Sequence, residues 1–126
     1  MTSNNSEKTR YNDEELSMFE QIIDDKLTAA REQLEFYMNQ LQELADNPDS
    51  KIKGLDDGIS TLENERITTL AGRQRKLIQH LENAKIRIKN KIYGVCRVTG
   101  KLISKERLMA VPHATLSIEA KQMNNR

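Results

Sequence analysis

The feature that most constrains this chain is a narrow apolar seam between Leu16 and Leu44. Its members recur every three or four residues: Leu16, Phe19, Ile23, Leu27, Ala30, Leu34, Tyr37 or Met38, Leu41 and Leu44. A repeat of about 3.5 residues is typical of a helix that packs along one line against another helix, as in a coiled coil. The seam therefore predicts one long helix.

The limits of this helix can also be predicted. Asn12 and Glu15 have the spacing of a capping box, in which each side chain accepts a hydrogen bond from the other residue's backbone N–H. Tyr11 precedes the cap and is placed to pack against Leu16. Pro48 cannot continue the helical hydrogen bonds, so we expect the helix to end near Ala45.

A second seam predicts a second long helix. We expect it to start near Ser60, where Ser60 and Glu63 have capping-box spacing, and to end before Gly94 as a left-handed C-cap. Its seam runs through Ile67, Leu70, Gln74, Leu77 or Ile78, Leu81, Ala84, Ile88 and Ile92.

Charge indicates how the two helices pair. Residues 12–46 hold ten acidic and two basic side chains, whereas residues 61–93 hold three acidic and eight basic ones. Antiparallel packing would neutralise both helices, so we expect an intramolecular hairpin over residues 11–93. An intermolecular coiled coil is the alternative. Aromatic residues are only 4% of the 126, which argues against a large compact core.

The connection between the helices, residues 47–60, is the predicted tip of the hairpin. Gly54 and Gly58 bracket Asp56 and Asp57 there. Asp and Gly are common in solvated turns for backbone reasons alone. The functional alternative is a pair of carboxylates delivered into a narrow space, near a metal ion or a basic surface.

The remaining residues divide into a polar start and a small globular end. Residues 1–10 are polar, and we expect them to be disordered. Residues 94–126 form a second domain: a turn at 96–100, a short β-hairpin of residues 101–103 with 107–111, a break at Pro112, and a helix over 114–123. The expected fold class is thus mostly α, a long antiparallel coiled-coil hairpin with a small globular end that contains a short β-hairpin and a C-terminal helix.

Cys96 is the single cysteine, so no internal disulfide can form. Two interpretations remain open for its thiol. A buried free cysteine behaves as a small apolar residue. Alternatively, Arg97 could lower the pKa of a reactive thiol, although no second cysteine could resolve it.

The chain resembles the DksA/TraR family of bacterial transcription factors, over roughly residues 11–121. The resemblance is carried by "RQRKLIQHLENAKIRIKNKIYGVC" and "ERLMAVPHATLSIEAK". It implies a coiled-coil hairpin with a four-cysteine zinc finger. The ligand positions fall on Cys96, Thr99, Ser117 and Ala120, so one of four ligands remains. A structural zinc ion needs four Cys or His donors. We therefore expect no metal and no other cofactor. The resemblance implies a zinc-finger-like globular end in which the turn at residues 96–100, termed the knuckle, is kept after its metal was lost.

The resemblance also implies a function. Members of this family bind RNA polymerase, insert the coiled-coil tip into its secondary channel and alter promoter complexes. The acidic tip motif maps its second acid onto Asp56, with Asp57 beside it, but its first position holds Lys53. Arg73, Arg75 and Lys76 are candidates for contact with the polymerase rim.

Some members also respond to the alarmone ppGpp, through basic residues of the second helix and the residue before the proline. Here Lys76 and Lys121 match basic positions, whereas His80 and Val111 replace two others. The implied alarmone site is therefore degenerate.

Other functional classes receive less support. His80 and His113 are isolated in sequence, and no nucleophile–base set or phosphate-binding glycine loop is evident, so we do not expect an enzyme. No apolar run is long enough for a membrane span, no secretory signal is evident, and no DNA-recognition helix is apparent. We expect a cytoplasmic monomer without membrane or specific DNA contacts. The alternative function is a dimeric adaptor coiled coil that no longer binds zinc.

Overall fold

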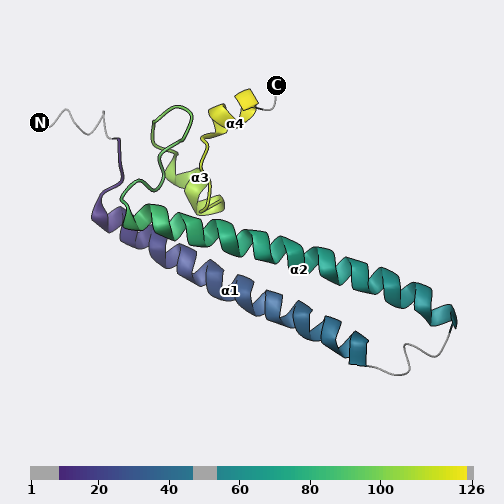
Figure 1. Cartoon of the computed structure of the whole chain (residues 1–126). Helices are drawn as coiled ribbons and strands as arrows, with labels where there is room; N and C mark the ends of the chain where they lie inside the picture. The colour runs from purple at the N-terminus through teal and green to yellow at the C-terminus, as the bar shows by residue number, and fades with distance from the viewer. Residues whose placement is uncertain (1–8, 47–53, 125–126) are drawn as a thin grey trace, which may run out of the picture. The chain divides into compact units, whose positions relative to one another are not determined.

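The computed structural model describes residues 9–46 and 54–124, in which four helices are found (Figure 1). These are α1 (Asp13–Asp46), α2 (Gly54–Lys89), α3 (Lys105–Ala110) and α4 (Ile118–Asn124). Within these ranges the only extended pairing is an isolated antiparallel bridge between Val95 and Leu102. The expected mostly helical fold with two long helices is confirmed.

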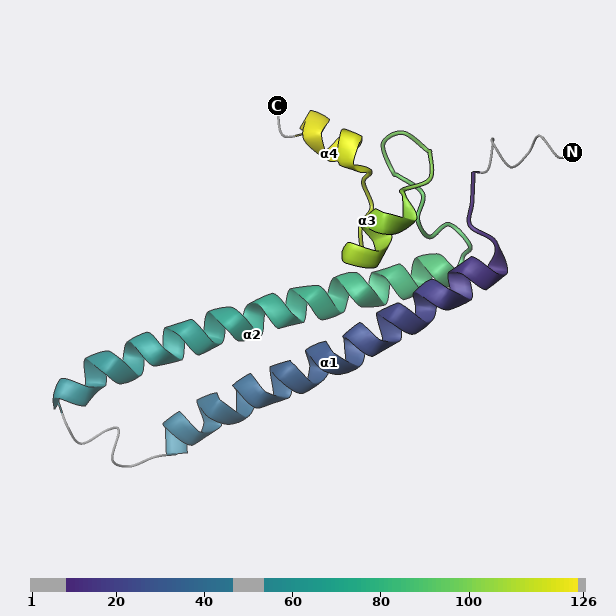
Figure 2. The same cartoon turned by 180° about the vertical axis from the view of Figure 1, so that it is seen from behind.

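The chain divides into two compact units. Unit 1 contains Met1–Lys26 with His80–Arg126, and unit 2 contains Leu27–Gln79. Within each unit, the segments of α1 and α2 lie side by side in both views (Figures 1 and 2). The long helices of the sequence therefore each contribute one segment to each unit.

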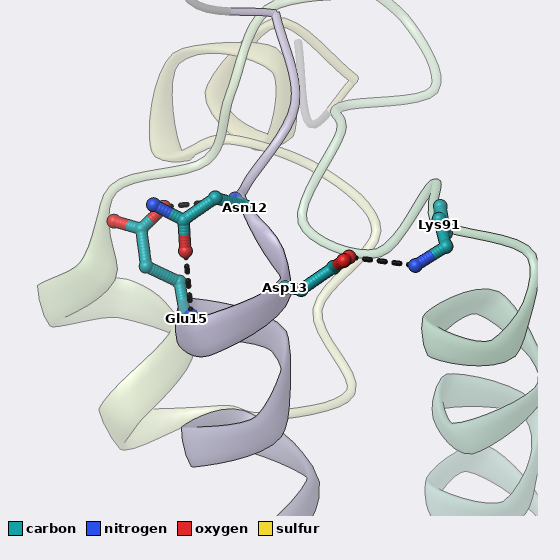
Figure 3. A network of polar contacts seen from close by, with 4 residues as sticks. All are labelled: Asn12, Asp13, Glu15 and Lys91. Atoms are coloured by element: carbon teal, nitrogen blue, oxygen red, sulfur yellow. Dashed lines mark hydrogen bonds and ion pairs between the residues drawn. The ribbon is translucent and has the colours of Figure 1, made fainter.

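The start of α1 carries the predicted capping box (Figure 3). The backbone N–H of Asn12 donates to Oε1 of Glu15 at 2.9 Å, and the N–H of Glu15 donates to Oδ1 of Asn12 at 2.8 Å. Glu15 also forms an ion pair with Lys105, the first residue of α3, with Oε2 2.6 Å from Nζ. One carboxylate thus caps α1 and ties α3 to it.

Two ion pairs in unit 1 show that α1 and α2 run antiparallel. Lys91 Nζ lies 2.6 Å from Oδ1 of Asp13, and Lys85 Nζ lies 2.7 Å from Oδ1 of Asp24. The later residue of α1, Asp24, therefore pairs with the earlier of the two lysines, Lys85, as antiparallel packing requires. All four side chains are substantially exposed, so these pairs contribute little to stability and serve mainly to fix orientation.

The core of unit 1 is built around three aromatic rings that pack at tilted angles, 60° between Tyr11 and Phe19 and 46° between Phe19 and Tyr93. The ring of Phe19 lies 5.5 Å from that of Tyr11 and 5.3 Å from that of Tyr93. Tyr11 donates its hydroxyl to the carbonyl of Ile103, and Tyr93 donates to the carbonyl of Pro112 at 2.7 Å. Both phenols thereby satisfy their polar ends while the rings are buried. The other apolar residues buried in this unit are Leu16, Ile23, Leu81, Ala84, Ile88, Cys96, Ile103, Leu108, Ala114 and Ala120.

Unit 2 is a thinner pairing of the two helices. Its fully buried apolar side chains, among those described, are Leu27, Ala30, Ile67 and Ala71. The predicted seam positions farther along both helices are only half-buried. Arg75 Nη2 lies 3.0 Å from the sulfur of Met38, so the basic side chain contacts this methionine, which stays 40% exposed.

Both expected boundaries of the second long helix were wrong. α2 begins at Gly54, so Ser60 lies inside the helix and does not cap it. The left-handed residue that ends α2 is Lys91, with φ 63°; Gly94 also has a positive φ, 80°, but lies three residues beyond this cap. The N–H of Ile92 donates to the carbonyl of Arg87 at 3.0 Å, which closes the helix as a Schellman motif three residues before Gly94. Ile92, expected in the seam, is consequently exposed.

The expected β-hairpin was also wrong, because residues 101–103 contribute only the isolated bridge residue Leu102 and the second expected strand is helical. Residues 105–110 form α3, because the hydroxyl of Ser104 accepts the N–H of Arg107 at 3.2 Å as an N-cap. Leu102 makes its bridge to Val95 instead of to residues 107–111. The expected helix over 114–123 begins later, at Ile118.

Candidate functional site

The turn around Cys96 keeps the form of a metal knuckle. The N–H of Cys96 donates to the carbonyl of Lys101 at 2.8 Å, and the N–H of Gly100 donates to the carbonyl of Cys96 at 2.8 Å. Gly100 has φ 73°, a left-handed conformation that favours glycine. Backbone hydrogen bonds therefore hold this loop closed without any help from a metal.

The four positions that hold ligands in the resembling family come together in unit 1 with other roles. The N–H of Ser117 donates to Sγ of Cys96 at 3.4 Å, and the hydroxyl of Ser117 accepts the N–H of Ala120 at 3.1 Å. The hydroxyl of Thr99 accepts the N–H of Lys101 at 3.2 Å. Cys96 and Ala120 are buried, at 1% and 0% exposure. Ser117 thus acts as a link between the thiol and the first turn of α4.

The thiol of Cys96 lies in a polar setting despite its burial. Burial raises its pKa, but hydrogen bonds from the side chain of Thr99 and from the backbone of Ser117, Thr99 and Val98 outweigh it and lower the pKa to about 6. The hydrogen-bond donors around the sulfur therefore favour ionisation of this thiol more than that of an ordinary cysteine.

These residues do not fit a structural zinc ion. Such an ion needs four donors, and here one thiolate is joined by two neutral hydroxyls and a methyl group. Both hydroxyls already accept backbone N–H groups. Within the described residues, no cluster of three or more His, Cys, Asp or Glu side chains is arranged to hold a metal.

A basic cavity lies beside the knuckle in unit 1. It has a volume of about 520 Å³, and its lining includes Arg87 from α2, Arg107 from α3 and Lys121 from α4. The segment between α3 and α4 closes another side, with Val111 and His113. None of the described lining residues is acidic, so the cavity has a positive potential.

The two histidines meet at this cavity. Their rings are stacked with centroids 5.4 Å apart and planes inclined by 8°. His80 and His113 are 33 positions apart in the chain and appeared isolated in the sequence. Arg87 and Arg107, which also line the cavity, were not singled out from the sequence. Their only signal was the excess of basic residues in the second helix and the globular end.

The predicted tip is only partly within the described structure. Asp56 and Asp57 lie in the first turn of α2, whereas Lys53 and the rest of residues 47–53 lie outside the described residues. The placement of the two aspartate side chains also lies outside the described part. Arg73, Arg75 and Lys76 lie exposed on the α2 segment of unit 2.

Among the described residues, no helix combines the length and apolar character needed to cross a membrane.

Two long helices followed by a knuckle with a single cysteine define a class of zinc-finger-like helical proteins, and comparison with known proteins agrees. Residues 91–122 match the family model described as the prokaryotic dksA/traR C4-type zinc finger. The chain is 30% identical over 119 residues to the "RNA polymerase-binding transcription factor DksA" of Caulobacter vibrioides, covering 91% of this chain and 79% of that protein. The chain belongs to the DksA/TraR family.

Two further relatives extend the comparison. "General stress protein 16O" of Bacillus subtilis is 33% identical over 97 residues, covering 75% of this chain and 57% of that protein. The structure of transcription factor DksA2 from Pseudomonas aeruginosa superposes with a TM-score of 0.80 at 24% identity, covering 87% of this chain and 82% of that one. At this identity, the likeness to DksA2 concerns the fold.

Proposed function

We propose that this chain is a transcription regulator that binds RNA polymerase and inserts the tip at residues 47–60 into the polymerase's secondary channel to modulate initiation. The observation that carries the proposal is its 30% identity, over 91% of its length, to a protein named as an RNA polymerase-binding transcription factor. The lengths of α1 and α2, 34 and 36 residues, support the proposal, because a tip that enters a channel has to be joined to the rest of the protein by long helices.

The proposed acting groups are Asp56 and Asp57. In this proposal their negative charges act near the polymerase active centre and change the lifetime of promoter complexes. The rim contact is assigned to Arg73, Arg75 and Lys76, which are exposed on one helix. Lys53 places a positive charge at the first acidic position of the family's tip motif. In this proposal Asp57 supplies the negative charge that this position lacks, and the size of the effect on promoter complexes depends on it.

The test is the double variant Asp56→Asn with Asp57→Asn, measured by binding to polymerase and by promoter-complex lifetime. We expect binding to be largely kept and the change in lifetime to be lost. Glu32→Gln with Glu35→Gln is the matched control, because it removes two charges from exposed positions on α1. Normal regulation by the tip double variant would overturn the carboxylate mechanism.

We further propose that the protein acts as a cytoplasmic monomer, performs no catalysis of its own and makes no membrane or specific DNA contact. We also propose that it folds without zinc, since one thiolate and two engaged hydroxyls replace four thiolates. Any alarmone response would use the basic cavity, since His80, Val111 and Lys121 line it while Lys76 does not.

The second candidate is a dimeric adaptor coiled coil. It is favoured by three apolar side chains in unit 2 that are exposed: Phe36 at 54%, Met38 at 40% and Leu62 at 68%. Light scattering at two protein concentrations separates the candidates. A dimer that dissociates on dilution would favour the adaptor, and a constant monomer mass would favour the channel-binding regulator.

A further inference from the structure

Residues 111–116, here termed the latch segment, are held to the rest of unit 1 largely through their carbonyl oxygens. Arg87 Nη2 donates to the carbonyl of His113 at 3.3 Å, and Tyr93 donates to that of Pro112 at 2.7 Å. On the other side, Arg107 Nε donates to the carbonyl of Leu116 at 2.8 Å. The latch segment therefore joins α2 and α3.

The same segment also reaches the knuckle. The N–H of Arg97, one residue after Cys96, donates to the carbonyl of Thr115 at 2.9 Å. Four carbonyls of the latch segment thus accept hydrogen bonds from outside it, and two of the donors are guanidinium groups. Loosening this segment would disturb α2, α3 and the Cys96 turn together.

His113 is the one side chain of the latch segment placed against α2 with an unmet polar atom. Its Nδ1 is buried and, among the described residues, is the only buried side-chain nitrogen or oxygen without a hydrogen-bond partner. A neutral imidazole can leave one nitrogen without a donor. An imidazolium has two N–H donors, so a proton on His113 would create a buried cationic N–H that lacks an acceptor.

The charges around His113 add to this cost. α2 contributes the stacked ring of His80 and the guanidinium of Arg87, and α3 contributes Arg107. α4 contributes Lys121 to the same cavity, and none of the described lining residues is an acid. Burial lowers the pKa of His113 below its ordinary value of 6.5, and the charges of His80, Arg87 and Arg107 lower it further.

We propose that the latch segment is a proton-operated switch, in which protonation of His113 drives it off α2 and opens the basic cavity as pH falls. The open state lets His113 carry its proton in water, away from Arg87 and Arg107. The proposal goes beyond polymerase binding and does not depend on it, because every group involved belongs to unit 1 of the isolated chain.

The direction of the effect follows from proton linkage. The closed state has the lower histidine pKa, so the open state binds more protons. Closure is therefore fully favoured above the ordinary histidine pKa of 6.5 and is progressively lost as pH falls toward the closed-state pKa. Each unit between the two pKa values makes opening about tenfold more frequent at a pH well below both.

Amide hydrogen exchange on the full chain measures this opening directly. The reporters are the N–H of Ala114, which donates to Val111, and the N–H of Arg97, which donates to Thr115. The internal control is the N–H of Ile103, which donates to Gly94 away from the latch segment. Protection factors, which correct for intrinsic exchange, are compared between about pH 7.5 and about pH 5.5, a range that spans ordinary histidine titration.

We expect the reporters to lose protection on acidification while Ile103 does not. His113→Gln removes the titrating group, so its reporters should show the same protection at both pH values, whatever their absolute level. His80→Gln keeps His113 but removes one neighbouring charge, so its acid response should be smaller than that of the wild type. His80→Gln also keeps the test of the switch possible if His113→Gln does not fold.

Histidine proton NMR gives an independent reading, because the chain has only two histidines and each single variant identifies the other. We expect His113 to titrate below 6.5 in the wild type and to move upward in His80→Gln. Reporters that respond equally to acid in the wild type and in His113→Gln would overturn the switch. A His113 titration midpoint above the ordinary histidine pKa of 6.5 would also overturn it.

Discussion

The ring of Tyr11 packs directly against the α-carbon of Gly94, where a Cβ would come within 2.6 Å of Cε2 of the ring and 3.2 Å of Leu108. Gly94 also has φ 80°, a conformation that L side chains rarely adopt. Tyr11 stands before α1 and Gly94 after α2, so this contact closes the end of unit 1 where the two chain segments meet.

Gly94→Ala should therefore destabilise the protein by about 2–4 kcal/mol, from backbone strain together with overpacking against the Tyr11 ring. Gly100→Ala is the matched control, because Gly100 has φ 73° but no atom within 4 Å of the added Cβ. It should cost only the strain, about 1 kcal/mol. Urea unfolding of both variants measures the difference, and equal losses would contradict the contact.

Thr99→Val should raise the pKa of Cys96 above about 6, because the Thr99 side chain is the largest of the donors that lower it. Thiolate absorbance near 240 nm during a pH titration follows the midpoint. Thr68→Val, an exposed position in unit 2, is the control and should leave the midpoint unchanged. An unchanged midpoint in Thr99→Val would show that the Thr99 hydroxyl does not lower the pKa of Cys96.

The same low pKa makes stability depend on pH. The folded thiol has a pKa of about 6 against an ordinary value of 9.0, so the unfolded chain binds more protons between these values. The free energy of unfolding should rise as pH increases from about 6 toward 9. Cys96→Ala should flatten this rise in urea unfolding curves. A rise of the same size in that variant would assign it to other groups.

The purified protein should contain no stoichiometric zinc, and a chelator should leave its Tm unchanged. The reason is that one thiolate and two engaged hydroxyls cannot supply four donors. Elemental analysis and thermal unfolding check this. The triple variant Thr99→Cys, Ser117→Cys and Ala120→Cys is the positive control and should gain one zinc ion. A wild-type Tm that falls on chelation would contradict the expectation.

Much of the fold could be predicted from the sequence because its information is local and periodic. The seam from Leu16 onward and the Asn12–Glu15 box specify α1 through contacts within a few residues. The end of α2 was misjudged because Lys91, a residue that seldom adopts positive φ, takes the position for which Gly94 was the better candidate. Gly94 is required instead by a long-range contact with Tyr11.

The small end was harder because its apolar pattern is short. Residues 107–111 are as compatible with a strand as with a helix by spacing alone, and the N-cap at Ser104 decides the outcome. Among the site residues, the grouping of Cys96, Thr99, Ser117 and Ala120 came from the family resemblance. The stacking of His80 on His113 could not be foreseen, because no sequence pattern joins positions that only the tertiary fold brings together.

The most direct test of the central claim is co-elution of the full chain with the host's core RNA polymerase, alongside a variant whose residues 47–60 are replaced by a short turn. Mixing at about 50 μM would detect a complex even with a Kd of about 10 μM. We predict a 1:1 complex that is weakened or lost in the shortened variant. No co-elution of the wild-type chain at this concentration would contradict polymerase binding and favour the adaptor.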